Sequence, residues 1–374
     1  MSTSPRAVVN MLWCVPGGVG GSEEYLVRQL LGLVAVGERW RPTVAMARGL
    51  VAAHPEVAAV LPCVEPSFDS SSRARRMIGE ATWLRTVARD VDLVHHGGGT
   101  APVSSWAAGR RGARQPYVLT VHDLQFRTYP QYFSAVKRAY LGVVLPGSAR
   151  GARMVAVPSE YVRRSVVAAY GIADDRVMVV PHGIAAAERH DITPADELRA
   201  RYSLGDGPVL VYPAVTHPHK NHRFLLEMMR DHWREPDLRL VLTGGRGSAH
   251  ADVEACTDPR VRHLGRVSAA DRNGLVAMST ALLFPSAYEG FGAPLIEAMT
   301  LGAPVVCSDR TCLPEVVGDA AQVLPLHADA WRDALDQAVR RRDELVAAGH
   351  HRAAQFTAEA SGRALAAVYE RALS

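Results

Sequence analysis

Residues 285–306 read PSAYEGFGAPLIEAMTLGAPVV, and this stretch decides the fold. The apolar run 281–286 is typical of a buried strand, and 303–309 is typical of another. Between them a glycine-containing turn leads into an apolar helix near Pro294, because proline suits the first turn of a helix. A strand, a helix and a second strand in this order form the repeating unit of a parallel α/β sheet.

The same rhythm of short apolar strand, loop and helix runs through the whole chain. The other expected strands are 7–13, 92–96, 117–122, 154–158, 209–214, 238–244 and 261–265. Helices are expected at 22–36, 73–89, 134–145, 159–170, 221–231, 268–277, 294–301 and 329–345. Because strands alternate with helices, we predict an α/β protein of two Rossmann-like domains with parallel sheets, facing each other across a cleft.

A polar segment without a strand pattern, 182–207, separates the two halves. We therefore place an N-terminal domain at 1–183 and a C-terminal domain at 184–356, each of a usual domain size. Residues 357–374 resemble one amphipathic helix, and we expect this helix to return to the N-terminal domain.

The composition, 48% hydrophobic and 21% charged, is that of a globular protein. No apolar run reaches the length of about 18 residues that a membrane helix needs. The five cysteines form no C-x-x-C pair, which favours a protein of the reducing cytoplasm over a disulfide framework. The charge is +8 in residues 1–183 and −4 in 184–374. The basic half suits an anionic partner or a peripheral membrane contact, the alternative being ordinary solvated helix faces, and we expect no nucleic acid partner.

Two carboxylates flank a candidate anion site in the opening stretch. Glu289 follows a buried strand, at the sheet edge where open α/β sheets bind ligands. Gly290 and Gly292 allow the backbone to approach a ligand closely, and the first amides of the next helix favour an anion. Glu297 lies about one turn into that helix. Amides for a diphosphate and carboxylates for hydroxyls suit a nucleotide sugar, whereas the alternative is two surface acids.

The segment EGFGAPLIE, from Glu289 to Glu297, resembles the signature of the retaining glycosyltransferases of family 4, two glutamates separated by seven residues. The resemblance implies the GT-B architecture. It also implies that Glu289 contacts the hydroxyls of the donor sugar and that Glu297 binds the ribose. The turn that would hold the sugar and the distal phosphate consists of Gly290, Phe291, Gly292, Ala293 and Leu295. Val267 belongs to the turn Gly265-Arg266-Val267, which resembles the turn whose backbone contacts the nucleobase in this family.

Lys220 and Asn221, in YPAVTHPHKNH (212–222), resemble the phosphate-binding loop of the same family. A cation there would neutralise the departing diphosphate. The family's preceding arginine is absent, because Val215 and Ala214 occupy those positions. The replacements left open are His217, His219 and Arg223. A metal cluster of His217, His219 and His222 is the rival reading, and its spacing is not typical of zinc.

Two segments of the first half are further candidates. PGGVGGSEEY (16–25) joins the first strand to the first helix, and Gly20 and Gly21 would approach phosphate or acceptor there. The alternative is a tight turn in which Ser22 caps the helix. His122, in HDLQFRTYPQYF (122–133), resembles the H-D-L element of mannose-transferring members. It would orient the reacting sugar, the alternative being a buried structural histidine.

The helix expected at 73–89 combines five arginines with Met77, Ile78, Trp83 and Leu84. Such a helix could lie on an anionic membrane. Packing of one apolar face on its own sheet is the alternative, and we favour it.

These observations predict a metal-independent enzyme that transfers a hexose, with retention, from a nucleoside diphosphate sugar to a hydroxyl acceptor. GDP-mannose is the favoured donor and a UDP-hexose the second. The acceptor would be a glycan, a small molecule or a lipid-linked or anionic compound, and no cofactor is expected. The alternatives are a sugar-nucleotide epimerase or phosphorylase of the same fold, and a two-domain sugar-binding protein.

Overall fold

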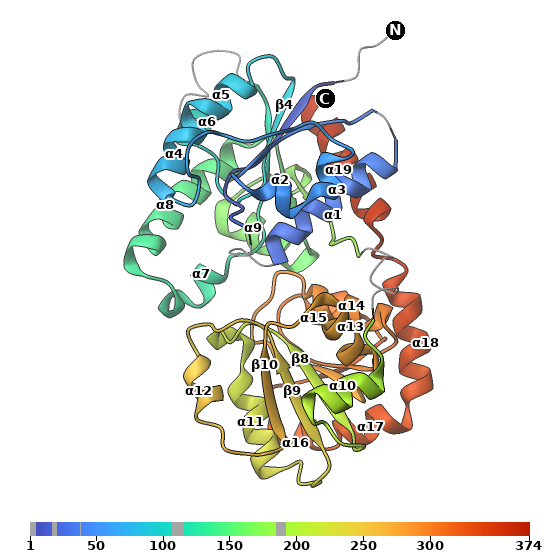
Figure 1. Cartoon of the computed structure of the whole chain (residues 1–374). Helices are drawn as coiled ribbons and strands as arrows, with labels where there is room; N and C mark the ends of the chain where they lie inside the picture. Colours follow the sequence, from blue (N-terminus) through green and yellow to red (C-terminus); the bar gives the residue numbers. More distant parts are fainter. Residues whose placement is uncertain (1–4, 17–20, 38, 107–114, 185–191) are drawn as a thin grey trace. The chain divides into compact units, whose positions relative to one another are not determined.

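The computed structural model describes residues 5–16, 21–37, 39–106, 115–184 and 192–374. The chain divides into two compact units (Figure 1): unit 1 comprises Met1–Gly183 with Thr357–Ser374, and unit 2 comprises Ile184–Phe356. Each unit is a parallel sheet with helices on both faces, so the predicted class of two Rossmann-like α/β domains is confirmed.

Unit 1 has the strand order β3-β2-β1-β4-β5-β6-β7. The strands are β1 (Ala7–Met11), β2 (Thr43–Met46), β3 (Cys63–Val64), β4 (Leu93–His96), β5 (Tyr117–Thr120), β6 (Met154–Val157) and β7 (Val177–Val179). Its helices are α1 (Gly21–Ala35), α2 (Leu50–Ala53), α3 (Pro55–Ala58), α4 (Arg73–Ala81), α5 (Trp83–Val87), α6 (Val103–Trp106), α7 (Gln125–Thr128), η1 (Pro130–Tyr132), α8 (Ala135–Gly151), α9 (Glu160–Tyr170), η2 (Asp174–Arg176) and α19 (Ala358–Leu373). Three of these strands, β2, β3 and β7, were not expected, and β3 and β7 are only two and three residues long.

Unit 2 has the strand order β10-β9-β8-β11-β12-β13. The strands are β8 (Val209–Pro213), β9 (Arg239–Thr243), β10 (Val261–Gly265), β11 (Ala281–Phe284), β12 (Val305–Ser308) and β13 (Gln322–Leu324). The helices are α10 (Ala195–Tyr202), η4 (Pro218–Lys220), α11 (His222–Asp231), α12 (His250–Glu254), α13 (Ala269–Ala277), α14 (Ala293–Thr300), α15 (Leu313–Val317), α16 (Ala328–Arg332), α17 (Ala334–Arg340) and α18 (Arg342–Ala353).

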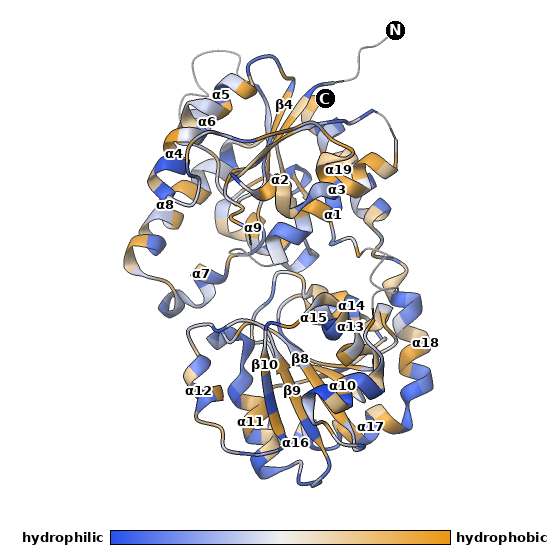
Figure 2. Cartoon of the chain, in the orientation of Figure 1, coloured by the Kyte–Doolittle hydropathy of each residue, from blue (hydrophilic) through white to orange (hydrophobic). Residues whose placement is uncertain are grey.

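The inner strands are mostly apolar and buried, since helices cover both faces of each sheet, and Figure 2 shows this apolar character. The edge strands β3, β10 and β13 are half-buried. The strand β4 ends in two adjacent histidines, which point to opposite faces of the sheet. His95 faces α19, where its Nδ1 lies 2.8 Å from the hydroxyl of Tyr369. His96 faces the opposite side, where its ring meets that of Tyr117.

Two expected helices are divided in the structure. The helix expected at 73–89 breaks at Thr82, whose hydroxyl donates to the carbonyl of Ile78 at 2.7 Å. Hydroxyls that bond back to the preceding turn compete with helix propagation. Met77 and Ile78 of α4 are exposed, while Leu84 of α5 is in the core, so only the second half packs as favoured. The helix expected at 329–345 consists of α16, α17 and the start of α18.

The C-terminal helix α19 packs on α1 in unit 1, and at their contact neither helix has room for a side chain. A Cβ on Gly32 would lie 1.8 Å from the carbonyl oxygen of Ala358, and one on Gly362 would lie 2.1 Å from the carbonyl carbon of Gly32. The glycines therefore allow the two backbones to touch.

We expect Gly32→Ala to destabilise the protein by about 1–3 kcal/mol, because the added methyl forces α19 away from α1. The matched control is Gly142→Ala in α8, where a Cβ would meet nothing within 4 Å. That variant should be unchanged or more stable by up to about 1 kcal/mol, because alanine favours helices. Urea unfolding of the two variants measures the difference, and equal stability would contradict the packing argument.

Candidate functional site

The sheet of unit 2 reverses its strand order between β8 and β11, which are neighbours although β9 and β10 separate them in sequence. Open α/β sheets bind ligands at such a switch point, beyond the carboxyl ends of the strands. The loop after β8 carries Lys220, and the loop after β11 carries Glu289. The topology therefore brings these two predicted residues to one place.

Lys220 and Glu289 form an ion pair, with Nζ 2.6 Å from Oε1. Both side chains are mostly buried, at 20% and 12% exposure. The ammonium also lies 5.5 Å from the centre of the Phe284 ring. An enclosed cation beside a carboxylate can hold a phosphate and a sugar hydroxyl at adjacent positions.

Hydrogen bonds to neighbouring loops fix both residues. The Tyr212 hydroxyl donates to the carbonyl of Lys220 at 2.7 Å and lies 3.1 Å from Ser286 Oγ. The amide of Glu289 donates to the hydroxyl of Thr311 at 3.0 Å. Thr311 follows β12 and has φ +55°, a strained conformation for a β-branched residue. Sequence reasoning missed Tyr212 and Thr311, although each lies at or just after the carboxyl end of an expected strand.

The helix α14 begins at Gly292, which has φ +87°. The Leu295 amide donates to the Gly292 carbonyl at 3.0 Å, so it is already engaged. In the described part of the chain, the amides of Gly292 and Ala293 have no protein acceptor. These are the N–H groups of the turn that can meet an anion at the positive end of the helix. Glu297 is half-buried, about one turn further along α14.

Two of the three predicted substitutes for the missing arginine have little capacity as a second cation. Burial, together with the charge of Lys220, lowers the pKa of His219 to about 3, so this ring is neutral at pH 7. Arg223 pairs with Glu227 on the exposed face of α11, with Nε 2.9 Å from Oε1. The third, His217, stacks on His219 with ring centres 5.8 Å apart.

The turn expected at the nucleobase borders a cavity of about 450 Å³ at the ends of β9 and β10. Its lining includes Gly245, Arg246, His263 and Arg266, whereas Val267 does not line it. The β9 and β8 loops are joined, because the Gly247 amide donates to Thr216 Oγ1 at 2.7 Å. Arginines of the β9 and β10 loops thus lie next to the loop that leads to Lys220.

In unit 1, His122 lies at the end of β5 in a cluster of rings. Its Nε2 donates to the carbonyl of Gly97 at 2.8 Å, which makes Nδ1 an acceptor in the neutral ring. Burial lowers the pKa of His122 to about 4. Its ring lies 5.5 Å from those of Trp13 and Tyr25, and Tyr25 stacks on His182 at 4.2 Å. Sequence reasoning did not assign Trp13, Tyr25 or His182 to a site.

The glycine-rich turn after β1 is only partly described. Gly20 lies outside the described residues, and Gly21 is the first residue of α1, where a Cβ would have open space around it. The first turn of α1 is tied to the start of α3 through His54. Its Nε2 lies 2.9 Å from Glu23 Oε1, and its Nδ1 lies 3.0 Å from Glu56 Oε1.

His54 should make stability depend on pH. Burial lowers its pKa, but the hydrogen bonds and charges of Glu23 and Glu56 outweigh burial and raise the pKa above 6.5. A raised histidine pKa stabilises the fold fully below the unfolded-state pKa, and this stabilisation is lost as pH rises through the folded-state pKa.

We expect His54→Gln to cost most stability at about pH 6 and progressively less towards about pH 8.5. Other buried histidines with lowered pKa, such as His95 and His122, act in the opposite direction in both proteins, so the difference between variant and parent isolates His54. Urea unfolding across this range measures it. A difference that does not vary with pH would refute the prediction.

The described residues contain no group of three or more histidine, cysteine, aspartate or glutamate side chains placed to hold a metal ion. His222 is buried and packs on Tyr212, with ring centres 4.7 Å apart. Among the helices described, none has the length and apolar character to span a bilayer.

Comparison with known proteins places this geometry in a family. Residues 19–188 match the model "Glycosyltransferase Family 4", and residues 207–341 match "Glycosyl transferases group 1". The chain is 32% identical over 256 residues to O-antigen chain mannosyltransferase B of Escherichia coli, covering 65% of this chain and 67% of that one. It is 27% identical over 223 residues to O-antigen chain mannosyltransferase RfbU of Salmonella typhimurium, covering 58% and 59%.

A solved structure shares the whole fold. The Anabaena protein HepE, determined in complex with UDP and glucose, superposes with a TM-score of 0.76 at 18% identity, covering 98% of this chain and 99% of that one. The alignments to the two mannosyltransferases span about two thirds of their length or less. From the matched family models, the relative at 32% identity and the shared fold, we conclude that this chain belongs to glycosyltransferase family 4.

Proposed function

We propose that this glycosyltransferase moves a hexose from a nucleoside diphosphate sugar to a hydroxyl acceptor, with retention of the anomeric configuration. The observation that carries the proposal is the ion pair of Lys220 and Glu289 at the switch point of unit 2. The mannosyltransferase relatives favour GDP-mannose. A UDP-hexose is the second candidate, because HepE was determined with UDP and glucose.

Each predicted residue has a distinct role in this proposal. Glu289 accepts hydrogen bonds from the donor sugar, and Glu297 holds the ribose. Lys220 and the amides at the start of α14 stabilise the charge that develops on the diphosphate as the glycosidic bond breaks. Since these groups supply the positive charge, we propose that no metal or cofactor is needed.

Arg266 is our candidate for the second cation. It lines the cavity at the end of β10, and the Cβ position of Gly245 lies 3.3 Å from its Nε. Unlike His219, an arginine is charged at every pH at which the enzyme works. His217 remains the alternative in the loop of Lys220 itself.

We propose that unit 1 binds the acceptor and that His122 contributes to orienting the reacting sugar. Its Nε2–H is committed to Gly97, so Nδ1 would accept a hydrogen bond from a sugar hydroxyl. By analogy with the family, the leaving phosphate itself would help to deprotonate the acceptor, so no protein nucleophile is assigned.

The test begins with melting curves in the presence of GDP, UDP, GDP-mannose and UDP-glucose, with and without EDTA. A ligand that binds the folded state raises the melting temperature by mass action. We expect one nucleotide and its sugar to act selectively and to be unaffected by EDTA. Failure of all four would contradict the proposal. Anomeric proton couplings of the product would then distinguish retention from inversion.

We propose that unit 1 also contacts an anionic membrane that presents the acceptor, and exposed side chains support this part of the proposal. Ile78 of α4 is 64% exposed, and Val136 and Val143 of α8 are 76% and 68% exposed. The helix α4 also carries arginines, and the segment 124–159, which includes α8, contains no aspartate or glutamate. Apolar side chains among cations suit the surface of an anionic bilayer. Sedimentation with phosphatidylglycerol vesicles should be lost in Ile78→Ser with Val136→Ser, and retention would contradict the contact.

A further inference from the structure

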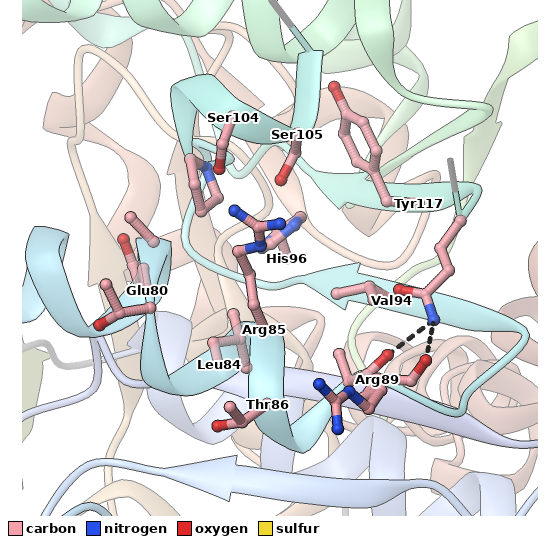
Figure 3. Close-up of a pocket in the computed structure, with 15 residues that line it drawn as sticks. Glu80, Leu84, Arg85, Thr86, Arg89, Val94, His96, Ser104, Ser105 and Tyr117 are labelled. Carbon is pink, nitrogen blue, oxygen red and sulfur yellow. Dashed lines mark hydrogen bonds between the residues drawn. The ribbon is translucent and has the colours of Figure 1, made fainter. Parts of the chain in front are cut away.

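A second polar cavity, of about 660 Å³, lies wholly within unit 1 (Figure 3). It is bounded by the end of α4, by α5, by α6 and by the strands β4 and β5. Its volume is that of a pocket for a small molecule. Neither His122 nor any residue assigned above to the donor site lines it.

Two residues that line the cavity, Glu80 and His96, are linked by hydrogen bonds to one buried side chain behind them, that of Asn10. The side-chain oxygen of Asn10 accepts a hydrogen bond from the Leu12 amide at 3.1 Å, so the side-chain nitrogen of Asn10 must donate. It donates to Glu80 Oε1 at 3.2 Å and to His96 Nδ1 at 3.3 Å. Burial lowers the pKa of His96 to about 4 and raises that of Glu80.

The hydrogen bonds of Asn10 determine which atoms of Glu80 and His96 remain for a ligand in the cavity. Because Nδ1 of the neutral His96 ring accepts from Asn10, its proton is on Nε2, which has no hydrogen-bond partner among the described residues. His96 is only 2% exposed, yet it lines the cavity. The second oxygen of Glu80 is an acceptor. A donor and an acceptor side by side match the hydroxyls of a sugar or another polyol.

The walls supply positive charge and hydroxyls. The labelled side chains of Arg85, Ser104 and Ser105 point towards the middle of the cavity (Figure 3). In the part of the chain that the structure describes, Arg85 makes no ion pair, whereas many exposed arginines here pair with a carboxylate nearby, as Arg223 does with Glu227. Arg89 also lines the cavity. Arginine with hydroxyl donors is a typical phosphate site.

We propose that this cavity binds a phosphorylated polyol, with the phosphate held by Arg85, Ser104 and Ser105 and a hydroxyl group held by His96 and Glu80. The same chemistry occurs in a soluble sugar phosphate and in the glycerol phosphate headgroup of an anionic lipid. The site does not depend on the proposed transferase mechanism, because its residues are separate from those of the donor site.

Calorimetric titration of the full chain tests the proposal, with mannose 6-phosphate, mannose and inorganic phosphate as probes. The background is Lys220→Ala, so that phosphate binding at the proposed donor site does not contribute. We expect mannose 6-phosphate to bind more tightly than the other two. Arg85→Ala should weaken it about tenfold or more, because a charge-assisted hydrogen bond is lost. Arg363→Ala is the control, since this exposed arginine of α19 makes no ion pair among the described residues.

A second arm distinguishes the two sources of the phosphate. Vesicles of phosphatidylglycerol are compared with phosphatidylcholine, using the parent and a Ser104→Ala, Ser105→Ala variant. Weaker binding of phosphatidylglycerol vesicles by that variant, with no binding of mannose 6-phosphate, would identify a lipid headgroup. The proposal is overturned if neither mannose 6-phosphate nor phosphatidylglycerol binds. It is also overturned if Arg85→Ala and the serine variant bind like the parent, or if mannose or inorganic phosphate binds measurably and as tightly as mannose 6-phosphate. None of these results bears on nucleotide binding, so failure here is separate from failure of the proposed function.

Discussion

Glu289→Gln should lower kcat by about 10²–10³-fold, the usual effect of removing one group that stabilises the transition state. Glutamine has the same shape and still accepts a hydrogen bond from Lys220, so the fold and the loop positions should persist. It lacks the negative charge that the proposed contacts with the sugar require. Because glutamine is uncharged, it also no longer balances the charge of Lys220. Initial rates with the donor identified by the melting curves measure the effect.

The control for this substitution is Glu227→Gln. Glu227 belongs to the same unit and also pairs with a cation, Arg223, but that pair is exposed at 73% and 41%. Exposed ion pairs contribute about 0–1 kcal/mol, so this variant should retain the parent rate and melting temperature. Equal rates for Glu289→Gln and the parent would remove Glu289 from the active site.

Lys220→Met should reduce kcat/KM by about 10²–10³-fold, because the diphosphate leaving group loses its enclosed cation. Nucleotide binding should weaken as well, since the negative phosphates are present before the bond breaks. Removal of the lysine also leaves the mostly buried Glu289 without its partner, so the melting temperature should fall.

The chain provides a matched control, because Lys137 is its only other lysine. It lies on α8 of unit 1, exposed and over the ring of Phe133. Lys137→Met should leave nucleotide binding and kcat/KM with a soluble acceptor unchanged. Lys220→Met with unaltered nucleotide affinity would show that another cation, such as Arg266, carries the phosphate interaction.

Features that depend on neighbours in the chain were predictable. Apolar periodicity reports strands and helices directly, and Pro294 after Gly292 marks the start of a helix. The two glutamates of EGFGAPLIE indicated the family for the same reason, since their spacing is set by one turn and one helix. Short strands such as β3 and β7 were missed because two or three residues carry no period.

The sequence by itself therefore determined the class of fold, the order of most of its strands and helices, and the charged residues of the candidate site. Tertiary structure alone decided which of them meet. Lys220 and Glu289 are 69 residues apart, and they pair because β8 and β11 are neighbours in the sheet. The chain of Asn10, Glu80 and His96 likewise comes from three separate segments. Such contacts are set by strand order and packing, which no local pattern encodes, since a period describes one element and not its neighbour.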